Sequence, residues 1–188
     1  MVVAHKPAPR LATKPPSYLT HMNSISFIIP SINRLTLHRT IASIDVWPGD
    51  EVLVEFDLPP SGRWGNDQRN KAMERAKGDY LAFIDDDDTY VPEHRWLMDE
   101  AILDQPNALH LFKMRYPNGD ELWTTNDMVP GNVSTQMILV PNNKDLLYHW
   151  EGGRNMADFI FVDHWLGKIV WRDDVIANLG HDGANYGK

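Results

Sequence analysis

The feature that most constrains this chain is an apolar run that ends in four consecutive aspartates, within residues 80–90. Residues 80–84 have the length and continuity of a strand that is buried on both faces of a sheet. Asp85 to Asp88 therefore follow the carboxyl end of that strand. Ligands of open α/β sheets bind at this edge, because the loops there carry chemistry on a rigid support. The sequence thus predicts a ligand site at the aspartates.

Adjacent aspartate side chains repel one another, and the repulsion falls when a positive charge lies among them. A divalent cation supplies such a charge. In an extended chain Asp85 and Asp87 point the same way, so they offer hard oxygen ligands to one Mg²⁺ or Mn²⁺ and leave positions for phosphate oxygens. Two structural alternatives fit the same residues. One is a solvated acidic turn, and the other is a helix that begins near Thr89, whose dipole favours negative charge.

Length and composition limit the class of protein. The chain has 188 residues, enough for one domain with a sizeable core. Its net charge of −8 would repel a phosphate backbone, so we expect no nucleic-acid partner, although a nucleotide that arrives with its metal is compatible. The absence of cysteine excludes disulfides and thiolate chemistry and is compatible with a cytoplasmic setting. No apolar run approaches the ~18 residues of a transmembrane segment.

The first part of the chain differs from the rest. Residues 1–23 are rich in proline, basic and without hydrophobic periodicity, which predicts a flexible arm or leader. Their three charges, Lys6, Arg10 and Lys14, are all positive, so the remainder is more acidic than the whole. We expect residues 24–188 to form the folded domain.

The order of the predicted elements indicates an α/β domain with right-handed βαβ units and a mostly parallel sheet. Helical spacing predicts two early helices, over residues 35–44 and 68–77, and Gly78 is expected to close the second as its C-cap. The early strands alternate with these helices, and apolar runs place them at residues 25–30, 51–57 and 80–84.

The second half of the chain mixes strands and helices. Pro92 is expected to open a helix that Pro106 ends. Asn118-Gly119 is a strong turn signal and predicts a hairpin between residues 108–116 and 121–125. The remaining predicted elements are a strand over 134–141, a helix over 157–166, and short strands over 169–171 and 175–178.

Four pieces of the sequence, taken in order, resemble the motifs of one enzyme family. They are Phe27-Ile-Ile-Pro-Ser-Ile-Asn-Arg34, the strand that ends at Asp57, Arg69-Asn70 with the run from Ala76 to Asp88, and Gly152-Gly153 shortly before Ala157-Asp158. Over residues 24–182 this order resembles family-2-type inverting glycosyltransferases. The resemblance implies a GT-A-like, Rossmann-like single domain, in which helices flank a mostly parallel central sheet and a small antiparallel hairpin is added.

The resemblance also implies a nucleoside-diphosphate-sugar donor, and UDP is favoured because members of the family commonly use it. By position, Asp57 would accept a hydrogen bond from the base, and Arg69 would reach the base or the diphosphate. Asp86 would meet the ribose or the sugar. The nucleoside pocket would be lined by Pro30, Ser31 and Arg34.

A metal ion is the cofactor that the resemblance implies. Asp87 would be the main ligand, with Asp85 near it. His181 resembles a late histidine that joins the metal in many GT-A enzymes, and a nitrogen ligand shifts the preference from Mg²⁺ toward Mn²⁺. The cation would stabilise the negative charge that builds on the departing phosphate.

Asp158 occupies the position of the family's general base. It would take the proton of an acceptor hydroxyl that attacks opposite the leaving group, which inverts the anomeric carbon. Its place at a helix start is expected to keep it ionised. Asp163 and Glu151 remain alternatives for the base. The acceptor hydroxyl could belong to a glycan, a lipid-linked molecule or a protein.

The chain departs from the family in two ways. Ala157 stands where the family usually has Glu, a residue that helps to bind acceptor, and the segment between the aspartates and Asp158 is short. A small acceptor site, or one completed in a homo-oligomer, would follow. Trp64, Trp123 and Trp150 lie near loops where a sugar face could stack.

Two other functions remain open from the sequence. A nucleotidyltransferase shares this kind of sheet and metal site but normally has a glycine-rich signature after its first strand, which Ser31 to Arg34 lacks. An inactive nucleotide-sugar or carbohydrate-binding module could keep the acidic loop without catalysis. Each residue singled out above also has a structural alternative, such as a strand-end aspartate, a helix-start aspartate or a surface ion pair.

Overall fold

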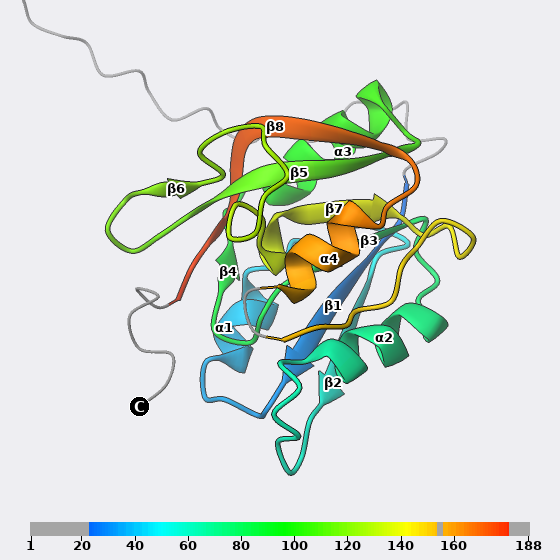
Figure 1. Cartoon of the computed structure of the whole chain (residues 1–188). Helices are drawn as coiled ribbons and strands as arrows, with labels where there is room; N and C mark the ends of the chain where they lie inside the picture. Colours follow the sequence, from blue (N-terminus) through cyan, green and yellow to red (C-terminus); the bar gives the residue numbers. More distant parts are fainter. Residues whose placement is uncertain (1–22, 154–155, 181–188) are drawn as a thin grey trace, which may run out of the picture.

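The structure, a computed structural model, describes residues 23–153 and 156–180 (Figure 1). Residues 1–22 of the predicted arm, and His181, lie outside the described residues. The described chain forms one eight-stranded sheet with the strand order β2-β1-β3-β7-β5-β8-β4, and β6 pairs with β5. No helix among the described residues has the length and apolarity needed to cross a bilayer. The predicted α/β class is confirmed.

The first half of the sheet is parallel, as predicted. Strand β1 (Ile25–Ser31) lies between β2 (Glu51–Phe56) and β3 (Tyr80–Phe83) and pairs with both in parallel. Helices α1 (Leu37–Ala42) and α2 (Asn66–Arg75) connect them. All seven residues of β1 are buried, because helices cover both faces of the sheet.

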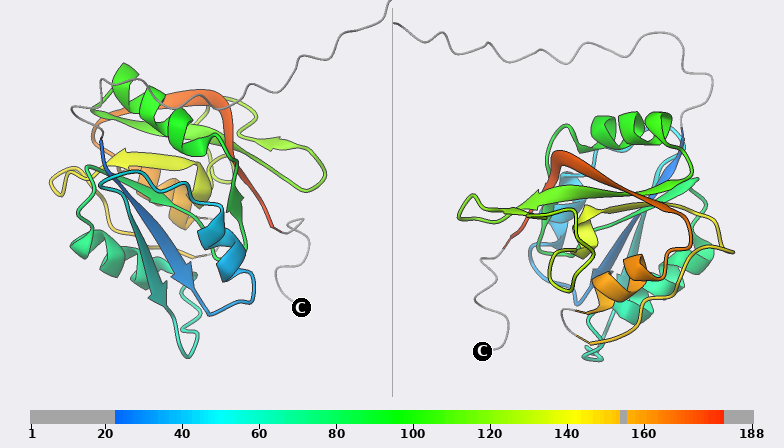
Figure 2. Two further views of the ribbon diagram at one scale, coloured as in Figure 1. Left: turned by 180° about the vertical axis from the view of Figure 1, so that it is seen from behind. Right: turned by 45° about the horizontal axis from the view of Figure 1, so that its top comes forward.

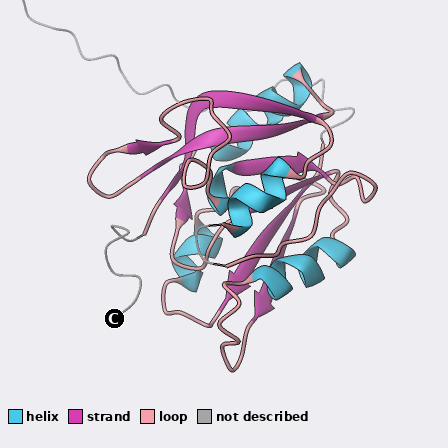
Figure 3. Cartoon of the chain, in the orientation of Figure 1, coloured by secondary structure: helices cyan, strands magenta, loops and turns pink. Residues whose placement is uncertain are grey.

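Strand β3 divides its side chains between two hydrophobic cores, as its continuous apolar run predicts. Tyr80 and Ala82 face the core that includes residues of α3 (His94–Asp104), whereas Leu81 and Phe83 face the core that contains residues of α2 and α4 (Ala157–Asp163). Figure 3 shows helices on both sides of the sheet. The strand that carries the aspartates is therefore held from both faces.

The second half of the sheet is mixed. Strand β5 (Ala108–Arg115) forms the predicted hairpin with β6 (Glu121–Leu122), and Gly119 at the turn has φ 92°. Strand β7 (Ile138–Pro141) is antiparallel to β3 and β5. The predicted strand over 134–141 is wrong in its first part, because a 3₁₀ turn, η1 (Thr135–Met137), precedes β7.

The late strands also differ from the prediction. Instead of two short strands, the chain forms one long strand, β8 (Lys168–Asn178), that runs parallel to β5 with register shifts along it. Its far end pairs with β4 (Thr89–Tyr90). Figure 2 shows β8 curving over the sheet toward β4. This curve brings the residues after β8 to the aspartate segment.

The predicted role of Gly78 as a helix C-cap is wrong. Helix α2 already ends at Arg75, and Gly78 instead lies against the start of β1, where its N–H donates to Ser26 Oγ at 2.9 Å. A Cβ atom on Gly78 would lie 2.5 Å from the Ser26 backbone nitrogen. Glycine is needed here because two backbones approach closely.

We therefore predict that Gly78→Ala lowers the free energy of unfolding by about 1–3 kcal/mol, because the methyl group separates β3 from β1. Urea denaturation measures the change. Gly153→Ala is the matched control, since a Cβ there has no heavy atom within 4 Å. Equal stability of the two variants would contradict the close approach of the two backbones.

Candidate functional site

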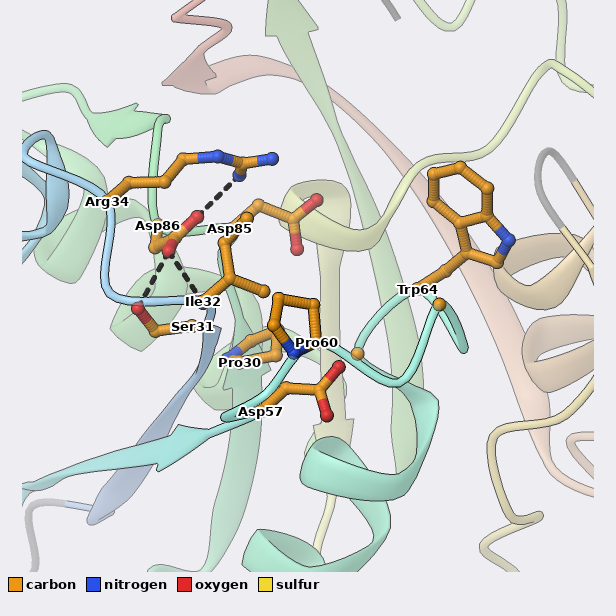
Figure 4. Close-up of a pocket in the computed structure, with 11 residues that line it drawn as sticks. Pro30, Ser31, Ile32, Arg34, Asp57, Pro60, Trp64, Asp85 and Asp86 are labelled. Carbon is orange, nitrogen blue, oxygen red and sulfur yellow. Dashed lines mark hydrogen bonds and ion pairs between the residues drawn. The ribbon is translucent and has the colours of Figure 1, made fainter. Parts of the chain in front are cut away.

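A cleft of about 210 Å³ lies at the carboxyl ends of β1 and β2, beside the turn that follows β3. The two strands meet here because the Asp57 N–H donates to the Ser31 carbonyl at 2.8 Å. In Figure 4 the acidic turn and Asp57 lie at opposite ends of the cleft, with two prolines between them. Its lining residues are Pro30, Ser31, Ile32, Arg34, Asp57, Pro60, Gly62, Trp64, Gly65, Asp85 and Asp86.

The four aspartates form a tight turn. The Asp88 N–H donates to the Asp85 carbonyl at 3.2 Å, and β4 begins at the next residue, so a helix that starts near Thr89 is excluded. The side chains still alternate in exposure. Those of Asp85 and Asp87 are partly exposed, whereas those of Asp86 and Asp88 are buried.

Asp86 ties this turn to the loop after β1. Its carboxylate accepts hydrogen bonds from Ser31 Oγ at 2.7 Å and from the Ile32 N–H at 3.1 Å, and Arg34 Nη1 lies 2.6 Å from it. These contacts supply hydrogen-bond donors and a positive charge to a carboxyl side chain that is 2% exposed. Asp86 therefore fixes the wall of the cleft.

Two arginines supply the positive charge that the aspartates require. Arg34 bridges Asp86 and Asp87, with its Nη1 3.2 Å from Asp87 Oδ2. Arg69 contacts Asp85, with Nη2 2.5 Å from Oδ1. In the described structure the repulsion is thus relieved by protein side chains from two different elements.

Asp88 has a different environment, which sequence reasoning missed. Gln136 Nε2 and the Gly180 N–H each donate to its carboxylate at 2.8 Å. Burial, together with the charges of Asp85 and Asp87, raises the pKa of Asp88 well above its usual value. Glycine is required at position 180, because a Cβ there would lie 1.7 Å from the Asp87 carbonyl oxygen.

The donor set at the turn fits a hard cation that a ligand completes. Among the described residues there is no group of three or more His, Cys, Asp or Glu side chains that could hold a metal by themselves. Mg²⁺ in nucleotide sites is usually held by one or two carboxylates together with substrate phosphates, which Asp85 and Asp87 match in number and chemistry. His181, the third predicted ligand, lies outside the described residues.

Asp57 stands at the other end of the cleft. Its Oδ2 accepts from the N–H and the hydroxyl of Ser61, both at 2.9 Å. Within the described residues its Oδ1 makes no hydrogen bond. The side chain is thus oriented by one oxygen and keeps the other as an acceptor for a ligand that donates a hydrogen bond.

Arg69 does not line the cleft, although the resemblance places it at the base or the diphosphate. It is 3% exposed and lies behind Asp85, where its Nη1 donates to the Trp64 carbonyl at 2.8 Å. Its guanidinium lies over the Trp150 ring, 4.8 Å from the centroid. The structure therefore shows Arg69 as an internal contact of the site.

Asp158 lies in the first turn of α4 and is half-buried. Thr135 Oγ1 donates to its Oδ1 at 2.5 Å. Burial raises the pKa of Asp158 to about 6, and the Asp85 charge adds to the rise, whereas Arg69 and the Thr135 hydrogen bond oppose it. The helix start was expected to keep Asp158 ionised; burial acts in the opposite direction and is the largest influence on its pKa. A carboxylate with such a pKa can accept a proton near neutral pH.

The structure brings six of the predicted residues to one cleft, and three more, Arg69, Asp87 and Asp158, lie near it, whereas His181 lies outside the described residues. Asp87 pairs with Arg34, Arg69 pairs with Asp85, and the charges of Arg69 and Asp85 both act on Asp158. Of the three tryptophans, Trp64 lines the cleft and is half-exposed, whereas Trp123 and Trp150 are buried and are not free to stack on a sugar. The partners Thr135 and Gln136 were missed because their 3₁₀ turn reads as strand.

The sequence pattern of Glycosyl transferase family 2 matches residues 59–154, which is half of the chain and includes the aspartate turn. This chain belongs to that family. A protein of Haemophilus influenzae named "Uncharacterized glycosyltransferase" is 33% identical over 143 residues, which cover 63% of this chain and 49% of that protein. The chain thus spans about half the length of this curated relative.

Solved structures share the fold. The structure of S. aureus TarS 1-349 has a TM-score of 0.62 and 16% identity, and covers 83% of this chain and 60% of the TarS chain. The same TarS region in complex with UDP-GlcNAc has a TM-score of 0.61 and 16% identity, over 88% of this chain and 62% of that chain. At this level of identity the likeness shows a common GT-A-like fold.

The burial of Asp158 makes a prediction for stability. Because its folded-state pKa of about 6 lies above that of an unfolded aspartate, the folded state binds the proton more tightly, and stability is lost as pH rises from about 4 through 6. Asp158→Asn should therefore be more stable than the wild type at pH 7, by about 1–3 kcal/mol, with the difference vanishing near pH 4. Urea denaturation across this pH range measures it, with the exposed Asp163→Asn as control. A pH-independent difference would contradict the account.

Proposed function

We propose that this domain transfers a sugar from a nucleoside-diphosphate sugar, with UDP as the nucleotide, to an acceptor hydroxyl with inversion. The main support for this proposal is the cleft. Asp57 lies at one end of it, and the acidic turn, whose charge is partly neutralised by Arg34 and Arg69, lies at the other. The bound UDP-GlcNAc of the structurally similar TarS supports the choice of donor.

The donor fits the cleft by chemistry. A uracil N–H would donate to Asp57 Oδ1, and Pro30 and Pro60 offer apolar surface to the nucleoside (Figure 4). The diphosphate would then point toward the acidic turn and Arg34. Asp86, which holds the loop of Ser31 and Arg34, would keep this wall in place for the ribose.

A cation, Mn²⁺ or Mg²⁺, would be held by Asp85 and Asp87 together with diphosphate oxygens. When bound, it would neutralise the charge that develops on the leaving phosphate. Arg34 lies within reach of the same end of the cleft and adds a second positive charge there. Gly180 contacts Asp88, so the chain that leads to His181 reaches this turn, which supports His181 as a further ligand.

Asp158 would act as the general base. Its carboxylate lies on α4, where Asp85 and Arg69 both act on its charge. The Thr135 hydrogen bond orients the side chain, and the pKa of about 6 leaves Asp158 mostly ionised at neutral pH, yet basic enough to take a proton. Attack by an activated hydroxyl opposite the leaving phosphate inverts the anomeric carbon.

Calorimetric titration tests the donor site. Wild-type protein should bind UDP with higher affinity in Mn²⁺ than in EDTA. Asp87→Asn should lose about 10-fold or more of the Mn²⁺-dependent gain, because the main metal ligand loses its charge. Asp145→Asn, an exposed aspartate outside the cleft, should behave as wild type. Equal affinity of the wild type for UDP in Mn²⁺ and in EDTA would contradict the metal site.

The base is tested by turnover. With a panel of UDP-sugars and saccharide acceptors, Asp158→Asn should reduce UDP release by about 10²–10⁴-fold, because proton transfer to a positioned base contributes that much. UDP binding in Mn²⁺ should persist in this variant. Asp163→Asn and Glu151→Gln test the alternative bases, and unchanged turnover in Asp158→Asn would exclude it. Release of pyrophosphate from UTP in the presence of a sugar 1-phosphate would instead indicate a nucleotidyltransferase.

A further inference from the structure

We propose that Arg69 is a positioning residue that joins the donor side of the site to the helix of the base and does not touch the donor itself. This inference rests on the proposed function, because it concerns the same cleft. It assigns Arg69 a role different from the direct base or diphosphate contact that the family resemblance implies.

The first support is the burial of Arg69. Its side chain is 4% exposed, and the Asp85 carboxylate, 31% exposed, lies between it and the solvent side of the turn. Two of its nitrogens are committed, Nη1 to the Trp64 carbonyl and Nη2 to Asp85. Asp85 lines the cleft, whereas Arg69 does not. The contact fixes the orientation of a predicted metal ligand from the rear.

The second support is Trp150, which contacts both Arg69 and the helix of the proposed base, α4. The Arg69 guanidinium lies over the Trp150 ring, which also contacts the rings of Phe83 of β3 and Phe161 of α4. Trp150 and Phe161 are stacked with centroids 4.4 Å apart and planes at 9°. Phe161 is about one helical turn from Asp158, so Trp150 packs against the helix that carries the proposed base.

Neighbouring side chains of α2 hold Trp150 in that position. Asn70 makes two hydrogen bonds with the Trp150 backbone, one accepted from its N–H at 2.7 Å and one donated to its carbonyl at 2.9 Å. Asn66 Nδ2 donates to the Gly152 carbonyl at 3.0 Å. Helix α2 thus clamps the segment that leads toward α4, and Arg69 lies at the centre of this clamp.

The energetics favour a functional reason for this arrangement. Arg69 Nε is buried and makes no hydrogen bond within the described residues, and an unpaired buried donor is destabilising. A well-packed apolar residue would avoid that cost. The positive charge of Arg69 has a function at this position because it acts on two carboxylates of the site. It pairs with Asp85, and it opposes the rise in the pKa of Asp158.

A test that does not depend on activity uses the ionisation of Asp158. Within the described residues the charged groups that act on Asp158 are Arg69 and Asp85, and Thr135 hydrogen-bonds to it. The pH midpoint of the stability difference between Asp158→Asn and its parent reports the pKa of Asp158. In an Arg69→Met background this midpoint should rise by about one unit or more, because the nearby positive charge is gone.

Matched variants separate charge from general destabilisation. Arg69→Lys keeps the charge and should return the midpoint toward that of the wild type. Arg75→Met removes an exposed arginine from the same helix and should leave the midpoint unchanged. If Arg69→Met does not fold, Arg69→Gln, which keeps a polar group for Asp85, takes its place. An unchanged midpoint in the charge-free variant would overturn the proposal.

Ligand binding distinguishes positioning from direct contact. In Arg69→Met the Mn²⁺-dependent gain in UDP affinity should fall about 10–100-fold, as expected for loss of a group that orients a metal ligand. Affinity for uridine, and for UDP in EDTA, should match that of the wild type. Loss of either metal-free affinity would mean that Arg69 touches the donor, which overturns the proposal. Absence of UDP binding in the wild type would count against the proposed function alone, since the stability readout remains.

Discussion

Four consecutive carboxylates in one turn repel one another, and the way the fold compensates their charge shapes the rest of the site. Arg34 reaches Asp86 and Asp87 from the loop after β1, while Arg69 reaches Asp85 from α2. Asp88 is instead buried and held by Gln136 and Gly180. Each pairing connects the turn to a different element, so charge compensation also fixes where β1, α2, η1 and the end of β8 meet.

The same pairings divide the site into a donor side and a base side. Asp57 and the prolines line the cleft on one side of the acidic turn, and Asp158 lies outside that lining, on α4, where the charges of Arg69 and Asp85 act on it. In the proposed reaction the two sides act on opposite faces of the anomeric carbon. A rigid connection between them matters, because displacement requires the acceptor and the leaving phosphate to be aligned.

Local patterns in the sequence predicted much of this arrangement. The apolar run of residues 80–84 identified a central strand, and the carboxyl ends of neighbouring parallel strands necessarily share one edge. Pro30, Ser31, Asp57 and the aspartates were therefore brought together by topology.

What the sequence did not reveal depends on tertiary contacts. The 3₁₀ turn at Thr135 has the composition of a strand, and its side chains matter only because Asp88 and Asp158 lie beside it. The burial of Trp150 and the ionisation of Asp158 are likewise set by neighbours distant in sequence, which periodicity does not report.

The central claim is that the aspartate turn and the cleft together hold a nucleoside diphosphate with its cation. A crystal soaked with Mn²⁺ and UDP tests it most directly. The account predicts anomalous density beside Asp85 and Asp87, with the diphosphate between this density and Arg34 and the base against Asp57. UDP bound elsewhere, or only water beside the two carboxylates, would contradict it.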